Sequence, residues 1–380
     1  MSSRPTIKSS ATPALLAASV VVTAAALFLR DARASRLAAE AAATSSTQSE
    51  SSTRFVADSR AMRLLERTWR ADNSLVYSAI FSTTAIYGAR RMETKARLMR
   101  APHRLSISYI SGDREGLQVG FNERWYWRQD DNTPMQAYVE VAKRPDQMAL
   151  RRMETLKKNY GARLLQATVL NGKACDVVEL RRLKTLDGAV GPTKRLWIER
   201  NTGLTIRTDS FNHQGKLVMR SQLSNLQVQR ASDASKTTLV KFVQPAQMAE
   251  VARTQPWIYE EMNDDYARAH KTVGIATPQV KEVPEGFVFD GVGTHRFDAL
   301  DKPTATFSRY SDGLNVITVF ALKKAADSTQ ENPSTCDFGT ASMAMRQLAD
   351  GTKLLAVGDL PVQTLQRVLD VTTVPATTSS

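Results

Sequence analysis

The order of helix-like and strand-like segments between residues 55 and 230 restricts the fold of this 380-residue chain more than any other feature. An amphipathic helix at about residues 59–71 comes first, and about six short runs rich in β-branched and aromatic residues follow it. A second helix, at residues 145–160, precedes about four more strand-like runs. Because helices and strands do not alternate, this order excludes a parallel βαβ sheet and predicts an antiparallel sheet with helices on one face.

An antiparallel sheet of about ten strands must curl. We therefore expect an α+β fold, in which a large curled antiparallel sheet (a half-barrel) packs on helices. A smaller antiparallel α+β domain is expected to follow it. The patterns there predict a terminal helix at residues 361–370 and strands at residues 304–310, 314–322, 337–348 and 353–358.

An apolar concavity is expected where the large sheet curls around its helices. A lipid or an unfolded protein segment would fit such a concavity. Plain core packing is the alternative for each lining residue, because large apolar side chains are usually buried. The candidate lining residues are Leu65, Trp69, Tyr77, Phe81, Trp125 and Trp127.

The net charge of +13 is distributed unevenly along the chain. Residues 1–54 carry 6 basic and 3 acidic side chains, residues 55–230 carry 31 and 17, and residues 231–380 carry 14 and 18. The three segments contribute +3, +14 and −4, which indicates separate domains with different partners. Since no concentrated basic block occurs, we expect an anionic lipid or lipopolysaccharide-like ligand, a membrane surface or an acidic partner segment, and no nucleic acid.

An apolar run at residues 11–29 follows a short stretch that carries Arg4 and Lys8. A positive flank before an apolar core is typical of an export signal. We therefore expect residues 1–34 to be a signal peptide, or a signal anchor that is retained, and the protein to lie in the periplasm or cell envelope. Residues 35–54 are rich in Ala, Ser and Thr and are expected to form a flexible linker.

The two cysteines, Cys175 and Cys336, leave two alternatives. In an oxidising compartment they could form a disulfide that clamps two domains together. The simpler alternative is two buried reduced thiols.

No motif in the sequence indicates catalysis or metal binding. The chain contains no nucleophile elbow, phosphate-binding loop or dinucleotide-binding glycine pattern. Its two cysteines and four scattered histidines do not have the spacing of zinc ligands. We expect no catalytic residue, no metal, no cofactor and no enzymatic activity.

Several motifs resemble a known family. Residues 170–180, 194–204 and 205–215 are similar to strands and hairpins of the LolA/RseB-type lipoprotein-binding fold. Later in the chain, the runs Pro-Glu-Gly-Phe, Tyr-Ser-Asp-Gly-Leu and Val-Gly-Asp-Leu-Pro resemble, in the same order, the C-terminal domain of the MucB/RseB family. The chain departs from that family where Ala276-Thr277-Pro278 stands at the place of its usual tryptophan.

The resemblance implies a division of the chain into domains. A LolA/RseB-like N-terminal domain would occupy residues 55–230, and a helical connector would occupy residues 231–273. A MucB/RseB C-terminal domain would occupy residues 274–373, followed by a disordered tail at residues 374–380.

The resemblance also implies a function. The protein would be an extracytoplasmic negative regulator of an envelope-stress sigma factor. It would bind the periplasmic domain of a membrane-spanning anti-sigma factor and sense a lipid or misfolded-protein signal. The C-terminal domain would make the main partner contacts, with Tyr310, Asp312, Gly313 and Leu314 as candidates. The alternative is a periplasmic lipoprotein carrier or lipid-binding protein, which would resemble residues 55–230 only.

Overall fold

The structure, a computed structural model, describes most of the two expected domains. The predicted leader, the linker and all but the last residue of the connector lie outside the described residues. The described residues are 57–87, 90–102, 104–121, 125–130, 133–139, 145–184, 193–230, 273–295, 305–322, 335–337 and 341–375.

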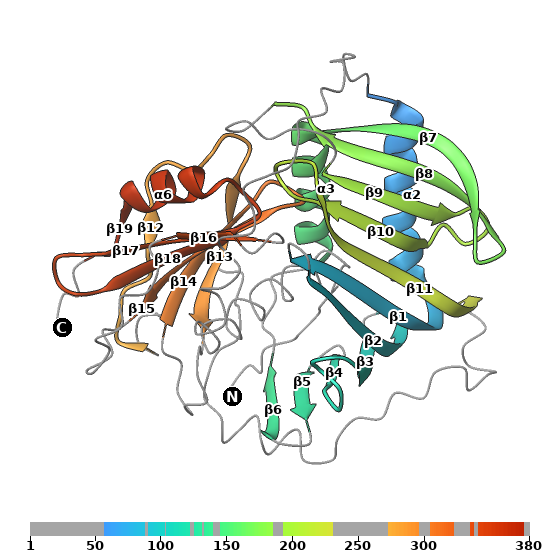
Figure 1. The fold of residues 1–380 in the computed structure, drawn as a ribbon, viewed down its shortest axis with the longest axis horizontal. Helices are drawn as coiled ribbons and strands as arrows, with labels where there is room; N and C mark the ends of the chain where they lie inside the picture. The colour runs from blue at the N-terminus through green and yellow to red at the C-terminus, as the bar shows by residue number, and fades with distance from the viewer. Residues whose placement is uncertain are drawn as a thin grey trace, which may run out of the picture.

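Eleven antiparallel strands of the described N-terminal region form one open sheet (Figure 1). The strand order is β6-β5-β4-β3-β2-β1-β11-β10-β9-β8-β7, so the last strand returns to pair with the first at the centre of the sheet. The strands are β1 (Leu75–Tyr87), β2 (Arg90–Ala101), β3 (Arg104–Ser111), β4 (Gln118–Phe121), β5 (Trp125–Asp130), β6 (Thr133–Val139), β7 (Tyr160–Leu170), β8 (Lys173–Arg182), β9 (Lys194–Glu199), β10 (Thr205–Phe211) and β11 (Leu217–Arg230).

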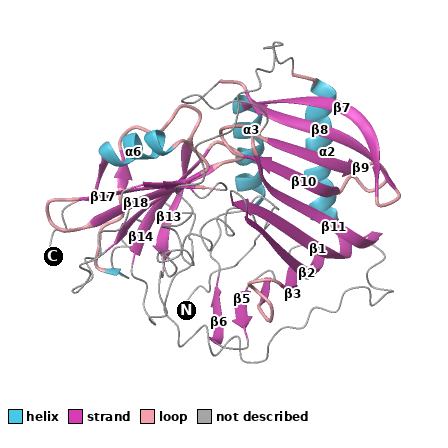
Figure 2. Ribbon diagram, viewed as in Figure 1, coloured by secondary structure: helices cyan, strands magenta, loops and turns pink. Residues whose placement is uncertain are grey.

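Two helices, α2 (Ser59–Ser74) and α3 (Pro145–Asn159), cross the strands of this sheet (Figures 1 and 2). The side chain of Asp58 caps α2 by accepting a hydrogen bond from the backbone N–H of Arg60 at 2.7 Å. Helix α2 spans two apolar clusters, because Ala61 lies in one cluster and Ala71 lies in the other.

The first cluster joins both helices to strands β7, β8 and β9. Leu65 of α2 and Leu156 of α3 pack there with Val178 and Leu180 of β8. The second cluster lies between the end of α2 and strands of the other half of the sheet, and includes Tyr77, Ala96, Leu98 and Ile107. Burial of these apolar side chains holds the helices on one face of the sheet.

The second domain is a smaller antiparallel sheet with strand order β13-β14-β15-β18-β17-β16 in the described residues. Helix α6 (Val362–Asp370) covers one face through Leu365, Val368 and Leu369. The strands are β13 (Val288–His295), β14 (Ala305–Ser311), β15 (Val316–Leu322), β16 (Thr335–Asp337), β17 (Ser342–Gln347) and β18 (Lys353–Gly358), and a separate short pair joins β12 (Gln279–Val280) to β19 (Thr372–Thr373).

The α+β prediction is confirmed: a large open antiparallel sheet packs on helices and a smaller antiparallel domain follows. The strand expected at residues 337–348 corresponds to β17, which begins at Ser342, and only the last residue of β16 falls within the expected range. The edge strand β13 was not predicted. Among the described residues, no helix has the length and apolar character needed to cross a membrane.

Candidate functional site

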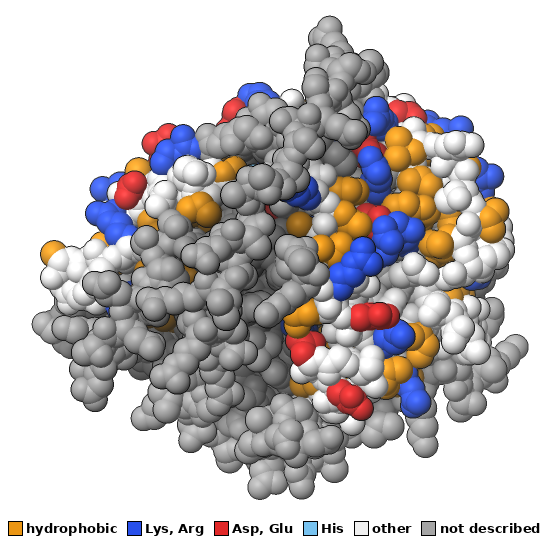
Figure 3. Space-filling model, viewed as in Figure 1, with side chains coloured by type: hydrophobic (Ala, Val, Ile, Leu, Met, Phe, Trp, Pro, Cys, Tyr) orange, Lys and Arg blue, Asp and Glu red, His pale blue; other side chains and the backbone are white. Residues whose placement is uncertain are grey.

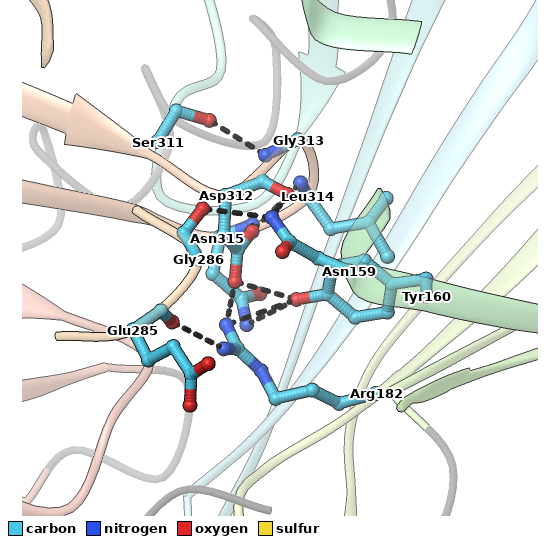
Figure 4. Close-up of polar contacts among 10 residues, drawn as sticks. All are labelled: Asn159, Tyr160, Arg182, Glu285, Gly286, Ser311, Asp312, Gly313, Leu314 and Asn315. Atoms are coloured by element: carbon cyan, nitrogen blue, oxygen red, sulfur yellow. Dashed lines mark hydrogen bonds and ion pairs between the residues drawn. The ribbon is translucent and has the colours of Figure 1, made fainter. Parts of the chain in front are cut away.

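The most densely bonded polar site lies where the two domains meet, and we call it the domain junction (Figure 4). The N-terminal domain contributes the end of α3, the start of β7 and the end of β8. The C-terminal domain contributes the loop before β13 and the turn between β14 and β15. Its residues are Asn159, Tyr160, Arg182, Glu285, Gly286, Ser311, Asp312, Gly313, Leu314 and Asn315.

The turn between β14 and β15 is shaped by the side chain of Asp312. Its Oδ1 atom accepts hydrogen bonds from the backbone N–H groups of Leu314 at 2.9 Å and Asn315 at 2.7 Å. Gly313 has a φ of 100°, which L side chains rarely adopt. This local geometry directs the second carboxylate oxygen of Asp312 away from the turn and toward the N-terminal domain.

Asp312 is a fully buried carboxylate, and its second oxygen has partners in the other domain. Its Oδ2 atom accepts a hydrogen bond of 2.6 Å from the hydroxyl of Tyr160 and forms an ion pair with Arg182. The exposed fraction is 0% for Asp312 and 1% for Tyr160, so water does not screen these contacts. Burial raises the pKa of Tyr160 far above its ordinary value, which keeps the hydroxyl protonated as a donor.

Asn159, the last residue of α3, ties the helix to two loops of the C-terminal domain. Its side-chain amide donates to the backbone oxygen of Gly286 at 2.7 Å and to that of Asp312 at 2.9 Å. A Cβ atom on Gly286 would lie 2.6 Å from the amide oxygen of Asn159. A Cβ atom on Gly313 would lie 2.6 Å from the backbone nitrogen of Leu156. Both glycines therefore permit an approach that a larger residue would prevent.

Arg182 bridges several groups of the junction. Its guanidinium donates to the backbone oxygen of Glu285 at 3.3 Å, and it lies 5.4 Å from the ring centre of Tyr160 and 5.3 Å from that of Phe287. Cation–π contacts of this kind are stronger where water is excluded. Arg182 thus combines an ion pair, a hydrogen bond and two aromatic contacts.

Two further ion pairs cross between the domains. The guanidinium of Arg152 on α3 lies 3.2 Å from the carboxylate of Asp290 on β13. Arg309 of β14 pairs with the same carboxylate oxygen at 3.1 Å. Lys184 pairs with Glu285 on the exposed rim. In all three cross-domain ion pairs named here, the cation belongs to the N-terminal domain and the carboxylate to the C-terminal domain. The charge difference between the two segments therefore has a structural counterpart at the junction.

The junction has the chemistry of a clamp between domains. The carboxylate of Asp312 is occupied by donors, and Tyr160 is held in its neutral form. In the described part of the chain, no group of His, Cys, Asp and Glu side chains has a geometry that could hold a metal ion.

The four residues predicted to bind a partner protein lie at or beside this junction. The exposed fraction is 5% for Tyr310 and 0% for Asp312, and Leu314 packs against the cluster formed by α2, α3 and β8. Direct contact of these four residues with a partner protein stays a prediction. Contact with the carboxylate of Asp312 would require the two domains to separate, whereas Tyr310 is buried in the core of the C-terminal domain itself.

Three of the six residues predicted to line one concavity are divided between two packed clusters. Leu65 belongs to the cluster between the helices and β8, whereas Tyr77 and Phe81 belong to the cluster near the end of α2. The hydroxyl of Tyr77 donates to Asp72 at 2.7 Å. These three residues are therefore not brought together at one surface.

The tryptophans of that set have different surroundings. Trp127 is 4% exposed and faces Gly120, where a Cβ atom would lie 2.0 Å from the indole ring. Trp69 is half-buried on α2. The side chain of Trp125 lies outside the described residues, although its backbone forms part of β5.

Cys175 is a buried free thiol in the cluster near the end of α2. Burial raises its pKa, which favours the unreactive thiol. Cys336 lies in β16 of the other domain, and its side chain is outside the described residues. In the structure Cys175 is therefore a buried reduced thiol, and its pairing with Cys336 stays a prediction.

Asn159, Tyr160, Arg182 and Asp290 were missed as site residues by the sequence analysis. Asp312 and Tyr160 are 152 positions apart, and no local pattern connects them. The signals in the sequence were indirect: an Asp-Gly turn in one domain and excess positive charge in the other.

Comparison with known proteins gives matches to both domains. Residues 60–243 match the MucB/RseB N-terminal domain, and residues 276–373 match the MucB/RseB C-terminal domain. No curated protein sequence matches the chain significantly.

Two solved structures share the overall fold. The Pseudomonas aeruginosa MucA/MucB complex structure matches at 17% identity and a TM-score of 0.50, covering 84% of this chain and 100% of that chain. A crystal structure of MucB in complex with MucA(peri) matches at 16% identity, with the same TM-score and coverage. A LolA superfamily protein from Nitrosomonas europaea matches at 10% identity and a TM-score of 0.23, covering 48% of this chain and 99% of that chain. With both domain matches in order over most of its length, the chain belongs to the MucB/RseB family.

Proposed function

We propose that this protein is an extracytoplasmic regulator that binds the periplasmic domain of a membrane-spanning anti-sigma factor and thereby restrains an envelope-stress sigma factor. The observation that carries the proposal is the presence of both MucB/RseB domains, in order, in one chain. MucB, a similar protein that matches 84% of this chain, has been solved in complex with MucA. The apolar run at residues 11–29 supports export.

The proposed activity is binding without a chemical step. Regulation by binding needs two arrangements of the protein that hold the partner with different affinity. The domain junction suits this role, because a small number of polar contacts, centred on Asp312 and Asp290, fixes one domain against the other. We propose that the partner binds the closed arrangement and that the signal favours separation of the domains.

The proposed signal is a lipid or a misfolded protein segment bound by the N-terminal domain. Its binding free energy would have to exceed the cost of parting the buried Asp312–Arg182 pair. A carrier of lipoproteins would use the N-terminal domain alone and would leave the second domain without a role. The regulatory proposal accounts for both domains.

The direct test is a crosslinked pull-down from membranes that contain the full chain and its membrane-spanning partner. We expect the anti-sigma factor to co-purify with the chain. Its clean absence from the crosslinked fraction would overturn the proposal.

A matched pair of variants tests the role of the junction. Arg182→Gln removes the cation that faces Asp312, whereas Arg181→Gln removes a neighbouring cation that is bonded to Glu179 instead. We expect Arg182→Gln to weaken binding to the partner's periplasmic domain and Arg181→Gln to leave it unchanged. Equal affinity of both variants would show that the junction does not regulate binding.

A further inference from the structure

A row of alternating charges runs across five strands of the large sheet. The strand register places each residue directly opposite the next, with cations and carboxylates in turn. Arg181 of β8 and Arg207 of β10 lie two residues from members of the row and so project from the same face. We call these seven residues the arginine face: Arg163, Glu179, Arg181, Arg195, Arg207, Asp209 and Arg220.

The two carboxylates of the arginine face lie beneath the guanidinium groups. Glu179 is 0% exposed and lies 2.8 Å from nitrogen atoms of Arg163, Arg181 and Arg195. Asp209 is 4% exposed and is bonded through both of its oxygens by Arg207 and by Arg220.

The surface therefore presents cations to its surroundings. Five arginines face two carboxylates, which leaves a surplus of three positive charges. The Arg163, Arg195 and Arg220 side chains are each about two-fifths exposed, at 39%, 38% and 40%. These three guanidinium groups are accessible to an external anion.

The arginine face is turned away from the helices. Residues alternate along the same strands, and Val178 and Leu180 of β8 pack against α2 and α3 on the other side. Figure 3 shows cationic side chains among hydrophobic ones over β7 to β11. Trp197 of β9 lies opposite Arg207 in the strand register, and its ring centre lies 4.1 Å from the guanidinium of Arg207. A tryptophan next to cations suits the boundary between water and a membrane.

The shape of the charged array favours a broad anionic surface over a single small anion. The row crosses five strands and so extends roughly 19 Å at ordinary strand spacing. The same face continues onto β2, because Arg220 pairs with Thr84 of β1, which in turn pairs with Glu93 of β2. Lys95 and Arg97 lie two and four residues after Glu93, so they project from this face as well. The charges thus extend over a wide sheet surface.

The start of the described chain lies beside one edge of the arginine face. The backbone N–H of Asp58, just before α2, donates to the oxygen of Ala162 at 2.7 Å. Ala162 directly precedes Arg163, the first member of the row. The chain that carries the apolar run at residues 11–29 therefore joins the folded domain at the edge of the arginine face.

We propose that the arginine face docks on anionic phospholipid headgroups at the surface of a membrane that borders the compartment to which the chain is exported. The guanidinium groups contact the phosphates, and Trp197 lies toward the interface. Docking orients the domain so that the helices and the domain junction remain on the side away from the lipid. This binding does not depend on the proposed anti-sigma partner, so the two proposals can fail separately.

The test uses the full chain and two kinds of vesicle, phosphatidylcholine alone and phosphatidylcholine with phosphatidylglycerol. The apolar run contributes to binding in both, so the difference between them isolates the electrostatic part. The variant Lys95→Gln/Arg97→Gln/Arg163→Gln removes three exposed charges and leaves two arginines on each buried carboxylate. The matched control, Arg60→Gln/Arg63→Gln/Arg70→Gln, removes three charges from the exposed side of α2. Circular dichroism melting verifies that both variants fold.

We expect the wild-type chain and the control to prefer the anionic vesicles, and the preference to decline with salt. The face variant should lose about tenfold or more of that preference, given the usual contribution of each basic residue near an anionic membrane. Equal loss in both variants would mean that only net charge matters and would overturn the proposal. Binding to polyglutamate but not to anionic vesicles would also overturn it and assign the face to an acidic protein segment.

Discussion

At the scale of single residues, Asp312 has the most consequential position in the described structure. A carboxylate without exposure is costly unless every lone pair has a donor. Asp312 meets this condition with two backbone N–H groups of its own turn, the hydroxyl of Tyr160 and the guanidinium of Arg182. One oxygen thus shapes the turn while the other connects the two domains.

Asp312→Asn removes the negative charge and keeps the shape of the side chain. Because Arg182 then remains poorly exposed without its counter-ion, we expect a loss of about 3 kcal/mol in the free energy of unfolding. Chemical denaturation of the full chain measures it. The control is Asp350→Asn, in an exposed Asp-Gly turn, which should change stability by less than about 0.5 kcal/mol. Similar effects of the two substitutions would contradict the importance of the buried pair.

Gly313→Ala tests the close approach of the domains. The new Cβ would meet the backbone of Leu156, and the φ of 100° strains any L side chain, so we expect a loss of roughly 2–4 kcal/mol. Gly172→Ala also has a positive φ, of 73°, but nothing lies within 4 Å of its Cβ position. Its cost should be limited to about 1 kcal/mol of backbone strain. Thermal unfolding of both variants provides the comparison.

The turn that contains Asp312 could be predicted from the sequence, but its neighbours could not. An Asp-Gly pair between two apolar runs predicts a hairpin turn from local conformational preferences alone. The contact with Tyr160 depends on how two separate domains are placed, and no spacing in the sequence encodes that.

At the scale of elements, α2 is held by two apolar clusters along its length. Leu65 packs in one cluster with α3 and β8, and Ala71 packs in the other, next to Tyr77. Periodic apolar residues predicted the helix, because a buried stripe is required wherever a helix covers a sheet.

Leu65→Ala distinguishes core packing from a ligand cavity. Leu65 is 7% exposed, so its substitution by alanine should lower the free energy of unfolding by about 3 kcal/mol if it is a core residue. The control is Leu183→Ala at a side chain 52% exposed, where little change is expected. A loss below about 1 kcal/mol in Leu65→Ala, together with weaker binding of an acyl chain, would instead show that Leu65 lines a ligand cavity.

The charge row across β7 to β11 makes stability depend on acidic pH. Burial alone would raise the pKa values of Glu179 and Asp209, but hydrogen bonds from their arginines outweigh it and hold both pKa values below the ordinary range. A carboxyl group with a lowered pKa stabilises the fold above its unfolded pKa, about 4.3 for Glu and 3.9 for Asp. That stabilisation is lost as the pH falls through the lower folded value.

We therefore expect the free energy of unfolding to decrease below about pH 4, and Glu179→Gln to flatten part of that decrease. Urea denaturation between neutral and strongly acidic pH measures the slope. An unchanged slope in Glu179→Gln would mean that other carboxyl groups cause the acid sensitivity.

Strand β13 shows where prediction of elements failed. It contains Gly291 and Gly293, which are typical of turns, and its pairing with β14 is interrupted between Phe289 and Gly291. An edge strand with a bulge needs no regular alternation of apolar residues. Strands β7 and β8, by contrast, could be predicted, because the Asn171-Gly172 pair between them is typical of a hairpin turn.

At the scale of the whole molecule, the uneven charge of the chain corresponds to the way its domains meet. The excess of cations in residues 55–230 provides Arg152 and Arg182 at the junction, and the acidic C-terminal domain provides Asp290 and Asp312. Composition predicted that two domains with different charge exist. It did not predict that they bind each other, since that depends on their three-dimensional surfaces.

Arg182→Gln should loosen the arrangement of the domains. We expect the radius of gyration from small-angle X-ray scattering to increase and the chain between the domains to be cleaved faster by protease, because the junction loses its central ion pair. Arg181→Gln is the control, since its side chain bonds to Glu179 on the other face of β8. Identical scattering from the two variants would mean that the other contacts suffice to hold the domains.

The pairing of β1 with β11 has a consequence for how the protein folds. Thr83 and Ser221 face each other across the centre of the sheet although 138 positions separate them. A chain that emerges from its N-terminus would form the hairpins from β1 to β6 while one side of β1 still has no partner strand. Such pairings between distant segments form slowly, and unpaired strand edges promote aggregation. The large domain can be completed only after residue 230 has emerged, so the free edge of β1 should favour aggregation until that point.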